Sequence, residues 1–487
     1  MLETASVNWS GFSEVWSFMA QIGVLLIALL FGNFLRLRVG FLRKMLFPAA
    51  LVAGILILIL KTILQLLKVD TNVVFDNAVM QIITYHTLGL GFTALTLKRN
   101  KKSSGKANVK KIFGYSLING GTYMLQASVG LLVTLLFFSK YYYAGIILPL
   151  GFAQGPGNAM IWGSNYEKYG LIGGASFGLT IATVGFIVSS VVGVIYMNVM
   201  RRRGKLIVRE SKAKQTDDAS LNGNAPDSGS VDKLSINMGL VALAYTLCYG
   251  FMWLLSSFGI QFLTNLVWGL NFMWAMLFGM VVKVVLTKME KNRPDDQTYR
   301  SNYLLDRISG FCFDLMIVAG VAAIEWESIA AYWVPILVLC VLGTVLTFLY
   351  IYYAAKHNFP GYEHETFLSN YGTLTGTASN GMILLREIDP DFVTPAATHL
   401  VMANVFNLLL NAPLFLLLAS VPTGMFGTEG KTSTWICFGL FTCLFLIYSF
   451  FLFRRPLMRH RYPKSQEEIW TEADGYVTRE SVDDGEE

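Results

Sequence analysis

Residues 150–159 read LGFAQGPGNA, and residues 370–381 read NYGTLTGTASNG. Each stretch lies between long apolar segments, yet each is too rich in Gly, Asn, Thr and Pro to continue as one helix. Irregular backbone at membrane depth is tolerated only where it is buried in protein or lines a cavity. A pair of such breaks at corresponding places in the two halves of a chain is typical of a transporter's binding site. The two stretches therefore predict a secondary transporter.

The composition is that of an integral membrane protein. The 487 residues are 54% hydrophobic and 14% charged, whereas roughly 25% of the residues of a soluble domain are charged. The net charge of +6 comes from basic residues that cluster between apolar segments. The positive-inside rule explains that placement, so we expect membrane lipid as a partner and no nucleic acid.

No enzyme motif accompanies the breaks. The sequence has no HExxH, GxSxG or Walker pattern, so we expect neither enzymatic activity nor a cofactor. The cysteines lie inside apolar runs without a CxxC, which is typical of packing residues rather than of a metal site or a disulfide framework.

Apolar segments of membrane-spanning length recur along nearly the whole chain. We expect spans at about 16–35, 47–67, 74–96, 112–139, 171–199, 236–258, 262–287, 308–325, 330–355, 395–420 and 434–453. The prediction is an all-α polytopic protein made of two five-span repeats, each with a re-entrant hairpin, and one extra C-terminal span. The expected parts are a first repeat at 1–200 with a hairpin near 146–163, a basic and disordered linker at 201–234, a second repeat at 235–422 with a hairpin near 366–385, the extra span at 423–456 and a cytoplasmic tail at 457–487.

The charges predict the orientation. Basic clusters follow the first, third, fifth, seventh and last spans, whereas the opposite loops hold few basic residues. This asymmetry places the N-terminus outside and the C-terminus in the cytoplasm of the plasma (inner) membrane. The second half then runs opposite to the first, and the two hairpins enter the membrane from opposite faces, which is the inverted-repeat plan of secondary transporters.

In the first break, Gly155 and Gly157 allow a tight turn, and Pro156 stops helix propagation. The end of a helical arm that presents N–H groups attracts an anion, and an end that presents carbonyls suits a cation. Gln154 and Asn158 add neutral donors and acceptors at the tip. We expect these residues to bind substrate; a kinked, closely packed helix is the alternative.

The second break combines hydroxyl groups and an amide with several glycines. Sodium, by analogy with calcium, prefers hydroxyl, carbonyl and carboxylate oxygens. Small residues that let helices approach closely are the alternative interpretation. We expect substrate to contact Thr375, Gly376, Thr377 and Asn380, and the ion to contact Thr373 and Ser379.

Three further polar features lie inside spans. Asn404, Asn407 and Asn411 share one stripe of the tenth span. They either complete the site, with Asn404 on the substrate and the other two on the ion, or join helices by hydrogen bonds. Asp314 is the deepest carboxylate and a candidate ion ligand, whereas His86 is more typical of a hydrogen-bonded packing residue.

The order of these features resembles the bacterial sodium/glutamate symporter family. GPG at 155–157, with AMIW at 159–162 and YEKYG at 166–170, is similar to its glycine-rich signature. DRISG at 306–310, AG at 319–320, EWE at 325–327 and GTLTGTA at 372–378 resemble further stretches of the family. The similar segments extend from about 20 to 420. A histidine usual in the first signature is replaced around Pro156-Gly157-Asn158, and the long basic linker and the eleventh span are additions.

The resemblance implies an elevator-type homodimer in which a moving part carries both hairpins past a scaffold. It implies that sodium entry drives uptake of a small anionic substrate, glutamate or a related carboxylate, with sodium as the coupling ion. A proton-coupled or exchange transporter of another organic anion is the alternative, and Asp314 or His86 would then titrate. A membrane sensor or channel is disfavoured because the chain has no output domain.

Overall fold

The computed structural model describes residues 13–69, 72–99, 109–206, 232–290, 300–390, 392–424, 430–454 and 456–457. All regular secondary structure in these ranges is helical. Ten helices of the described chain are long and apolar enough to cross a membrane. The helix α14 (Asn302–Ala322) is not among them, and it carries the charged residues Asp306, Arg307 and Asp314.

The first half of the chain forms five long helices and one interruption. The helices are α1 (Ser13–Arg38), α3 (Ala49–Leu66), α5 (Asn77–Leu97), α6 (Val109–Phe137) and α9 (Gly174–Arg202), with the short α2 (Gly40–Lys44) and α4 (Asn72–Phe75). Between α6 and α9 lie the short turns η1 (Ser139–Tyr141), η2 (Ala144–Ile146), α7 (Ile147–Pro149) and η3 (Leu150–Gln154), followed by α8 (Pro156–Glu167).

The second half also contains long helices and an interruption between α16 and α17. Its helices are α11 (Lys233–Ser256), α12 (Gln261–Gly269), α13 (Asn271–Met289), α14, α15 (Trp326–Asn358), α16 (Glu363–Thr375), α17 (Ala378–Arg386), α18 (Ala396–Met402), α19 (Asn404–Leu417), α20 (Ser420–Thr423) and α21 (Gly430–Phe453). Two expected spans are divided: 262–287 breaks at Leu270 and 395–420 breaks at Ala403. Residues 207–231 of the expected linker and 458–487 of the expected tail lie outside the described residues.

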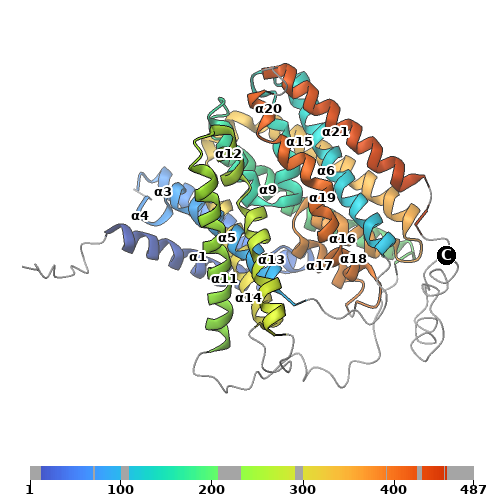
Figure 1. Cartoon of the computed structure of the whole chain (residues 1–487), viewed down its shortest axis with the longest axis horizontal. Helices are drawn as coiled ribbons and strands as arrows, with labels where there is room; N and C mark the ends of the chain where they lie inside the picture. The colour runs from blue at the N-terminus through green and yellow to red at the C-terminus, as the bar shows by residue number, and fades with distance from the viewer. Residues whose placement is uncertain are drawn as a thin grey trace, which may run out of the picture.

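The long helices pack as two groups. In the α5–α14 group, α5 and α14 pack along each other and are flanked by α3, α13, α1, α11 and α12. In the α6–α15 group, α6 packs against α15, α19 and α21, and the broken helices α8, α9, α16 and α17 complete the group. Figure 1 shows α6, α15, α19 and α21 side by side in one half of the molecule and α1, α3, α11 and α14 in the other. The two groups meet where α8 and α9 contact α5, α12 and α14.

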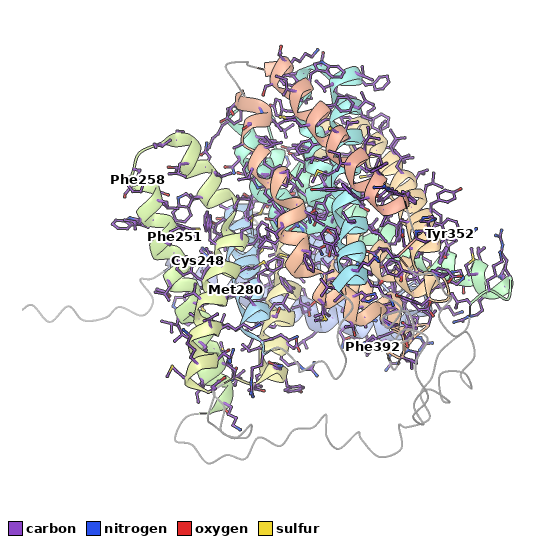
Figure 2. The ribbon with its side chains drawn as sticks, turned by 45° about the vertical axis from the view of Figure 1, so that its right-hand side comes forward. Cys248, Phe251, Phe258, Met280, Tyr352 and Phe392 are labelled. Atoms are coloured by element: carbon purple, nitrogen blue, oxygen red, sulfur yellow. The ribbon has the colours of Figure 1, made fainter. Side chains whose placement is uncertain are left out.

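Large apolar side chains cover the outside of the helices. Figure 2 shows Phe258, just after α11, and Met280 of α13 at the periphery of the α11–α13 pair, and both are exposed. Cys248, between these helices, is fully buried. An apolar exterior around a core that holds the polar residues is what a hydrocarbon surrounding requires.

Candidate functional site

The first break is a sharp reversal at a single glycine. The turn η3 ends at Gln154, and Gly155 adopts φ +85° and ψ −172° before α8 begins at Pro156. This backbone conformation is essentially restricted to glycine. No side chain of the described residues caps α8, so the N–H groups of its first turn have no side-chain acceptor from this part of the chain. Gly155 therefore forms a tip that presents the positive end of a helix.

A hydrogen bond joins the segments on either side of the first break. The hydroxyl of Tyr143 donates to the carbonyl of Tyr169 at 2.6 Å. Burial raises the pKa of Tyr143 to about 12, and Tyr142 and Tyr141 add to the shift. The hydroxyl therefore stays protonated at physiological pH, and the donor is retained.

The second break joins two antiparallel arms that touch through glycine. A Cβ at Gly372 of α16 would lie 2.6 Å from the Cα of Gly381 of α17. A Cβ at Gly376, between the arms, would lie 2.5 Å from Nδ2 of Asn380. Thr377 is extended and precedes α17, which no side chain of the described residues caps. The second break therefore also ends in an uncapped helix N-terminus.

The two tips lie against each other. A Cβ built on Gly155 would be 3.5 Å from Cγ2 of Thr377 and 4.0 Å from Cε of Met316 in α14. A Cβ on Gly157 would meet Leu88 of α5 and the sulfur of Met316 at 2.9 and 3.1 Å. The tips thus converge where the α6–α15 group meets α5 and α14. The uncapped first turns of α8 and α17 begin at this point.

The helix α6 contacts both breaks through polar side chains. Tyr123 donates to the carbonyl of Ala153 at 3.0 Å and accepts from Nε2 of Gln154. Gln126 donates to the carbonyl of Leu374 at 3.0 Å and to Oγ1 of Thr347 at 2.9 Å. Both α6 side chains are buried. One face of α6 therefore fixes the last turn of helix before each break.

The helix α9 supports the second hairpin. Oγ of Ser189 donates to the carbonyl of Gly372 at 3.2 Å, and Nδ2 of Asn380 donates to the same Oγ at 3.5 Å. A Cβ at Gly185 would lie 2.5 Å from the carbonyl oxygen of Thr375. Only glycine leaves room for this close approach of α9 to the C-terminal end of α16.

Several predicted site residues gather at the tips. Gln154, Gly155, Gly157, Asn158, Thr375, Gly376, Thr377 and Asn380 all lie in the two breaks. The hydroxyl groups of Thr373 and Thr375 donate to the carbonyls of Ser369 and Tyr371 in their own helix. Ser379 lies in the first turn of α17 and is exposed.

The structure describes the side chains of two of the three asparagines of α19. Asn411 donates to Oδ1 of Asn119 in α6 at 3.1 Å, so it joins two helices. Oδ1 of Asn407 is buried and has no hydrogen-bond partner among the described residues. The side chain of Asn404 lies outside what the structure describes.

Asp314 and His86 are not brought to the tips. Both side chains are exposed in the single chain. His86 is hydrogen-bonded to the hydroxyl of Tyr245 at 3.0 Å and lines an apolar surface groove with Leu315 and residues of α1. Asp314 is next to Leu315 in α14.

Sequence reasoning missed Tyr123, Gln126, Thr347 and Ser189. Tyr123 and Gln126 form polar positions at helical spacing inside an apolar span, and this pattern was the available signal. Ser189 and Thr347 are small hydroxyl residues in long apolar helices, which carry no comparable signal.

A comparison with protein-family models identifies the chain. The model of the sodium/glutamate symporter family matches residues 16–364, more than half of the 487 residues. The chain belongs to the sodium/glutamate symporter family. Searches of curated proteins and of solved structures gave no match. The matched range includes the first break and ends at the start of α16, so the second break lies beyond it.

Membership of this family of transporters agrees with the long apolar helices. Together they make the chain a multi-pass membrane protein. The family description also supports sodium-coupled transport and gives sodium as the fitting coupling ion.

Proposed function

We propose that the protein is a sodium-coupled secondary active symporter that imports glutamate or a related small carboxylate. The observation that carries the proposal is the convergence of two uncapped helix N-termini, α8 and α17, at Gly155 and Thr377. A helix N-terminus attracts a carboxylate through its free N–H groups and its dipole. The carboxylates of the bound substrate accept hydrogen bonds from the N–H groups of these two first turns, in place of side-chain caps. The substrate set is that predicted from the sequence, with Asn158, Thr375, Thr377, Asn380 and Asn404 as its central residues.

The coupling ion would bind oxygens at the C-terminal, negatively polarised helix ends of the same breaks. The last turn of α16 ends in carbonyl groups and carries the hydroxyl of Thr373, which belongs to the sequence-based ion set. Sodium, like calcium, is a hard cation that prefers such oxygens. The sequence-based ion set also contains Ser379, Asn407, Asn411 and Asp314, of which Ser379 is the member at the tips.

An inverted repeat would explain why the breaks meet. The contacts between helices come in matching pairs: α3 packs on α14 as α13 packs on α5, and α9 packs on α15 as α19 packs on α6. If α5 corresponds to α14 and α6 corresponds to α15, each contact in a pair turns into the other when corresponding helices are exchanged. Such an exchange is the contact pattern that a pseudo-twofold axis generates.

Two equivalent hydrogen bonds give independent support for the repeat. Asp76 and Ser301 are the residues that cap the N-termini of α5 and α14. The backbone N–H of Asp76 donates to Oε1 of Gln21 in α1 at 3.2 Å. The backbone N–H of Ser301 donates to Oδ1 of Asn237 in α11 at 3.1 Å. In each half, an amide of the first span thus holds the start of the third span.

An elevator mechanism suits the division into two helix groups. Both hairpins belong to the α6–α15 group, and α8 and α9 make its main contacts with the α5–α14 group. We assign the moving part to the α6–α15 group and the scaffold of a homodimer to the α5–α14 group. The charge pattern supports an N-terminus outside and a C-terminus inside.

The test is uptake of labelled glutamate into proteoliposomes that contain the purified protein, with and without an inward sodium gradient. Accumulation above equilibrium that requires the sodium gradient is expected. Uptake driven by a pH jump without sodium would overturn sodium coupling and favour the proton-coupled alternative. Alanine at each of the central substrate residues should reduce uptake; if uptake and affinity stayed intact, the assigned site would be wrong.

A further inference from the structure

A chain of hydrogen bonds connects α6 to the first turn of α8. Tyr123 donates its hydroxyl hydrogen to the carbonyl of Ala153 at 3.0 Å. The hydroxyl oxygen of Tyr123 accepts from Nε2 of Gln154 at 2.5 Å. Oε1 of Gln154 accepts from Nδ2 of Asn158 at 2.9 Å. Each of these four residues is thus tied to the next.

The backbone carbonyl of Ala153 fixes the donor and acceptor of every hydrogen bond in this series. A carbonyl can only accept, and a tyrosine hydroxyl has a single hydrogen. Tyr123 therefore gives its hydrogen to Ala153 and presents only lone pairs to Gln154. The amide of Gln154 must turn its NH₂ group toward Tyr123 and its oxygen toward Asn158. The amide of Asn158 is then left with its oxygen at the open end.

The side-chain oxygen of Asn158 at the open end needs a hydrogen-bond donor or a cation as its partner. The side chain of Asn158 is fully buried, and its Oδ1 has no hydrogen-bond partner in the part of the chain that the structure describes. A buried acceptor without a partner costs about 1–3 kcal/mol. Asn158 also lies in the uncapped first turn of α8. This turn therefore offers backbone donors for an anion together with one side-chain acceptor.

The same arrangement recurs at the second break. Nε2 of Gln126 donates to the carbonyl of Leu374 and to Oγ1 of Thr347, so the orientation of its amide is also fixed by a backbone carbonyl. Oε1 of Gln126 is buried and has no hydrogen-bond partner among the described residues. Each break thus orients one amide so that its oxygen stays open.

We propose that Tyr123 and Gln154 are positioning residues that hold Oδ1 of Asn158 as a ligand for a monovalent cationic group at the first break. The group is the coupling sodium or the ammonium of the transported amino acid, both of which need an oxygen acceptor. This inference rests on the proposed function and assigns a role inside its site.

The experiment measures ligand binding to the purified full-length protein by thermal stabilisation. Sodium is titrated alone at constant ionic strength, and glutamate and glutarate are titrated at saturating sodium. The variants are Tyr123→Phe, Asn158→Asp and the double variant Tyr123→Phe/Asn158→Asp. Tyr166→Phe is the matched control, because this buried tyrosine donates to the carbonyl of Leu418, away from the tips.

Tyr123→Phe frees the amide of Gln154 to turn, so the affinity for the cationic group should fall about tenfold, the scale for losing a residue that orients a ligand. A loss of affinity for sodium alone assigns the oxygen to sodium. A loss for glutamate but not for glutarate, with sodium affinity unchanged, assigns it to the ammonium group. The double variant should restore affinity, because a carboxylate presents an acceptor in either orientation. Tyr166→Phe should change no affinity.

Equal sodium and glutamate affinities in Tyr123→Phe and wild type would overturn the inference. So would a loss of affinity in Tyr123→Phe that the double variant does not restore. Failure of the wild type to bind glutamate in a sodium-dependent way would instead be a failure of the proposed function. The two results are therefore distinguishable.

Discussion

Gly155 and Thr377 come from breaks in opposite halves of the chain, yet a Cβ on Gly155 would lie 3.5 Å from Cγ2 of Thr377. Each residue immediately precedes a helix that no described side chain caps. This contact brings the positive ends of α8 and α17 together, and the proposed substrate site depends on it.

The first prediction concerns the backbone of the first tip. Gly155→Ala places a side chain at φ +85° and ψ −172°, a conformation that costs about 1–3 kcal/mol for a residue other than glycine. We expect a lower thermal midpoint and a loss of sodium-driven glutamate uptake. Gly439→Ala in α21 is the control, because an added Cβ there meets no atom within 4 Å. Uptake by Gly155→Ala equal to that of the control would contradict the prediction.

The second prediction concerns the support of the second hairpin by α9. Ser189→Ala leaves the carbonyl of Gly372 without its donor, and an unsatisfied buried group costs about 1–3 kcal/mol. We expect a lower thermal midpoint and weaker glutamate binding. The neighbouring Ser190 is equally buried and provides the control variant Ser190→Ala. The same loss in both variants would show that the bond to Gly372 has no particular role.

The sequence identified some of the residues on which these predictions depend and missed others. Glycine located both breaks, together with Pro156 in the first, because these residues disfavour a continuous helix whatever surrounds them. The long helices followed from the length of their apolar runs. The break at Leu270 was missed although Gly269 and Asn271 flank it, because apolar residues dominate the surrounding segment.

The sequence predicted that both breaks contribute to one substrate site, but not which residues of the two tips touch. This contact depends on the packing of α8 against α5 and α14 and of α9 against α16, which local patterns do not encode. The roles of Tyr123 and Gln126 depend on the same packing, because their partners Ala153 and Leu374 lie in different elements. The sequence left Asn411 as a ligand or a helix-joining residue, and its bond to Asn119, which joins α19 to α6, depends on the same packing.

A third prediction separates sodium coupling from proton coupling. Asp314 is exposed and lies outside the two tips, so Asp314→Asn should retain sodium-driven glutamate uptake within about twofold, the scale expected for a surface substitution. The measurement is the sodium dependence of uptake in proteoliposomes at two pH values. A large loss of sodium affinity would establish Asp314 as an ion ligand. Loss of pH-driven uptake alone would support the proton-coupled alternative.

A fourth prediction concerns a buried ion pair in the α5–α14 group. Nη2 of Arg300 lies 2.6 Å from Oε2 of Glu290, and their side chains are 2% and 3% exposed. Arg300→Leu removes the arginine from a buried ion pair and should destabilise the protein by about 3–5 kcal/mol, whereas replacing both residues by leucine should cost much less. Thermal unfolding of the single and double variants measures this difference. Equal midpoints in the two variants would contradict it, and sodium affinity should change in neither.

The central claim is that substrate binds between the two tips. The most direct measurement is a cryo-electron microscopy structure of the protein in sodium and glutamate. The account predicts density for glutamate in contact with the first turns of α8 and α17, beside Gly155 and Thr377. Glutamate density elsewhere in the molecule, with the space between the tips filled by protein alone, would contradict it.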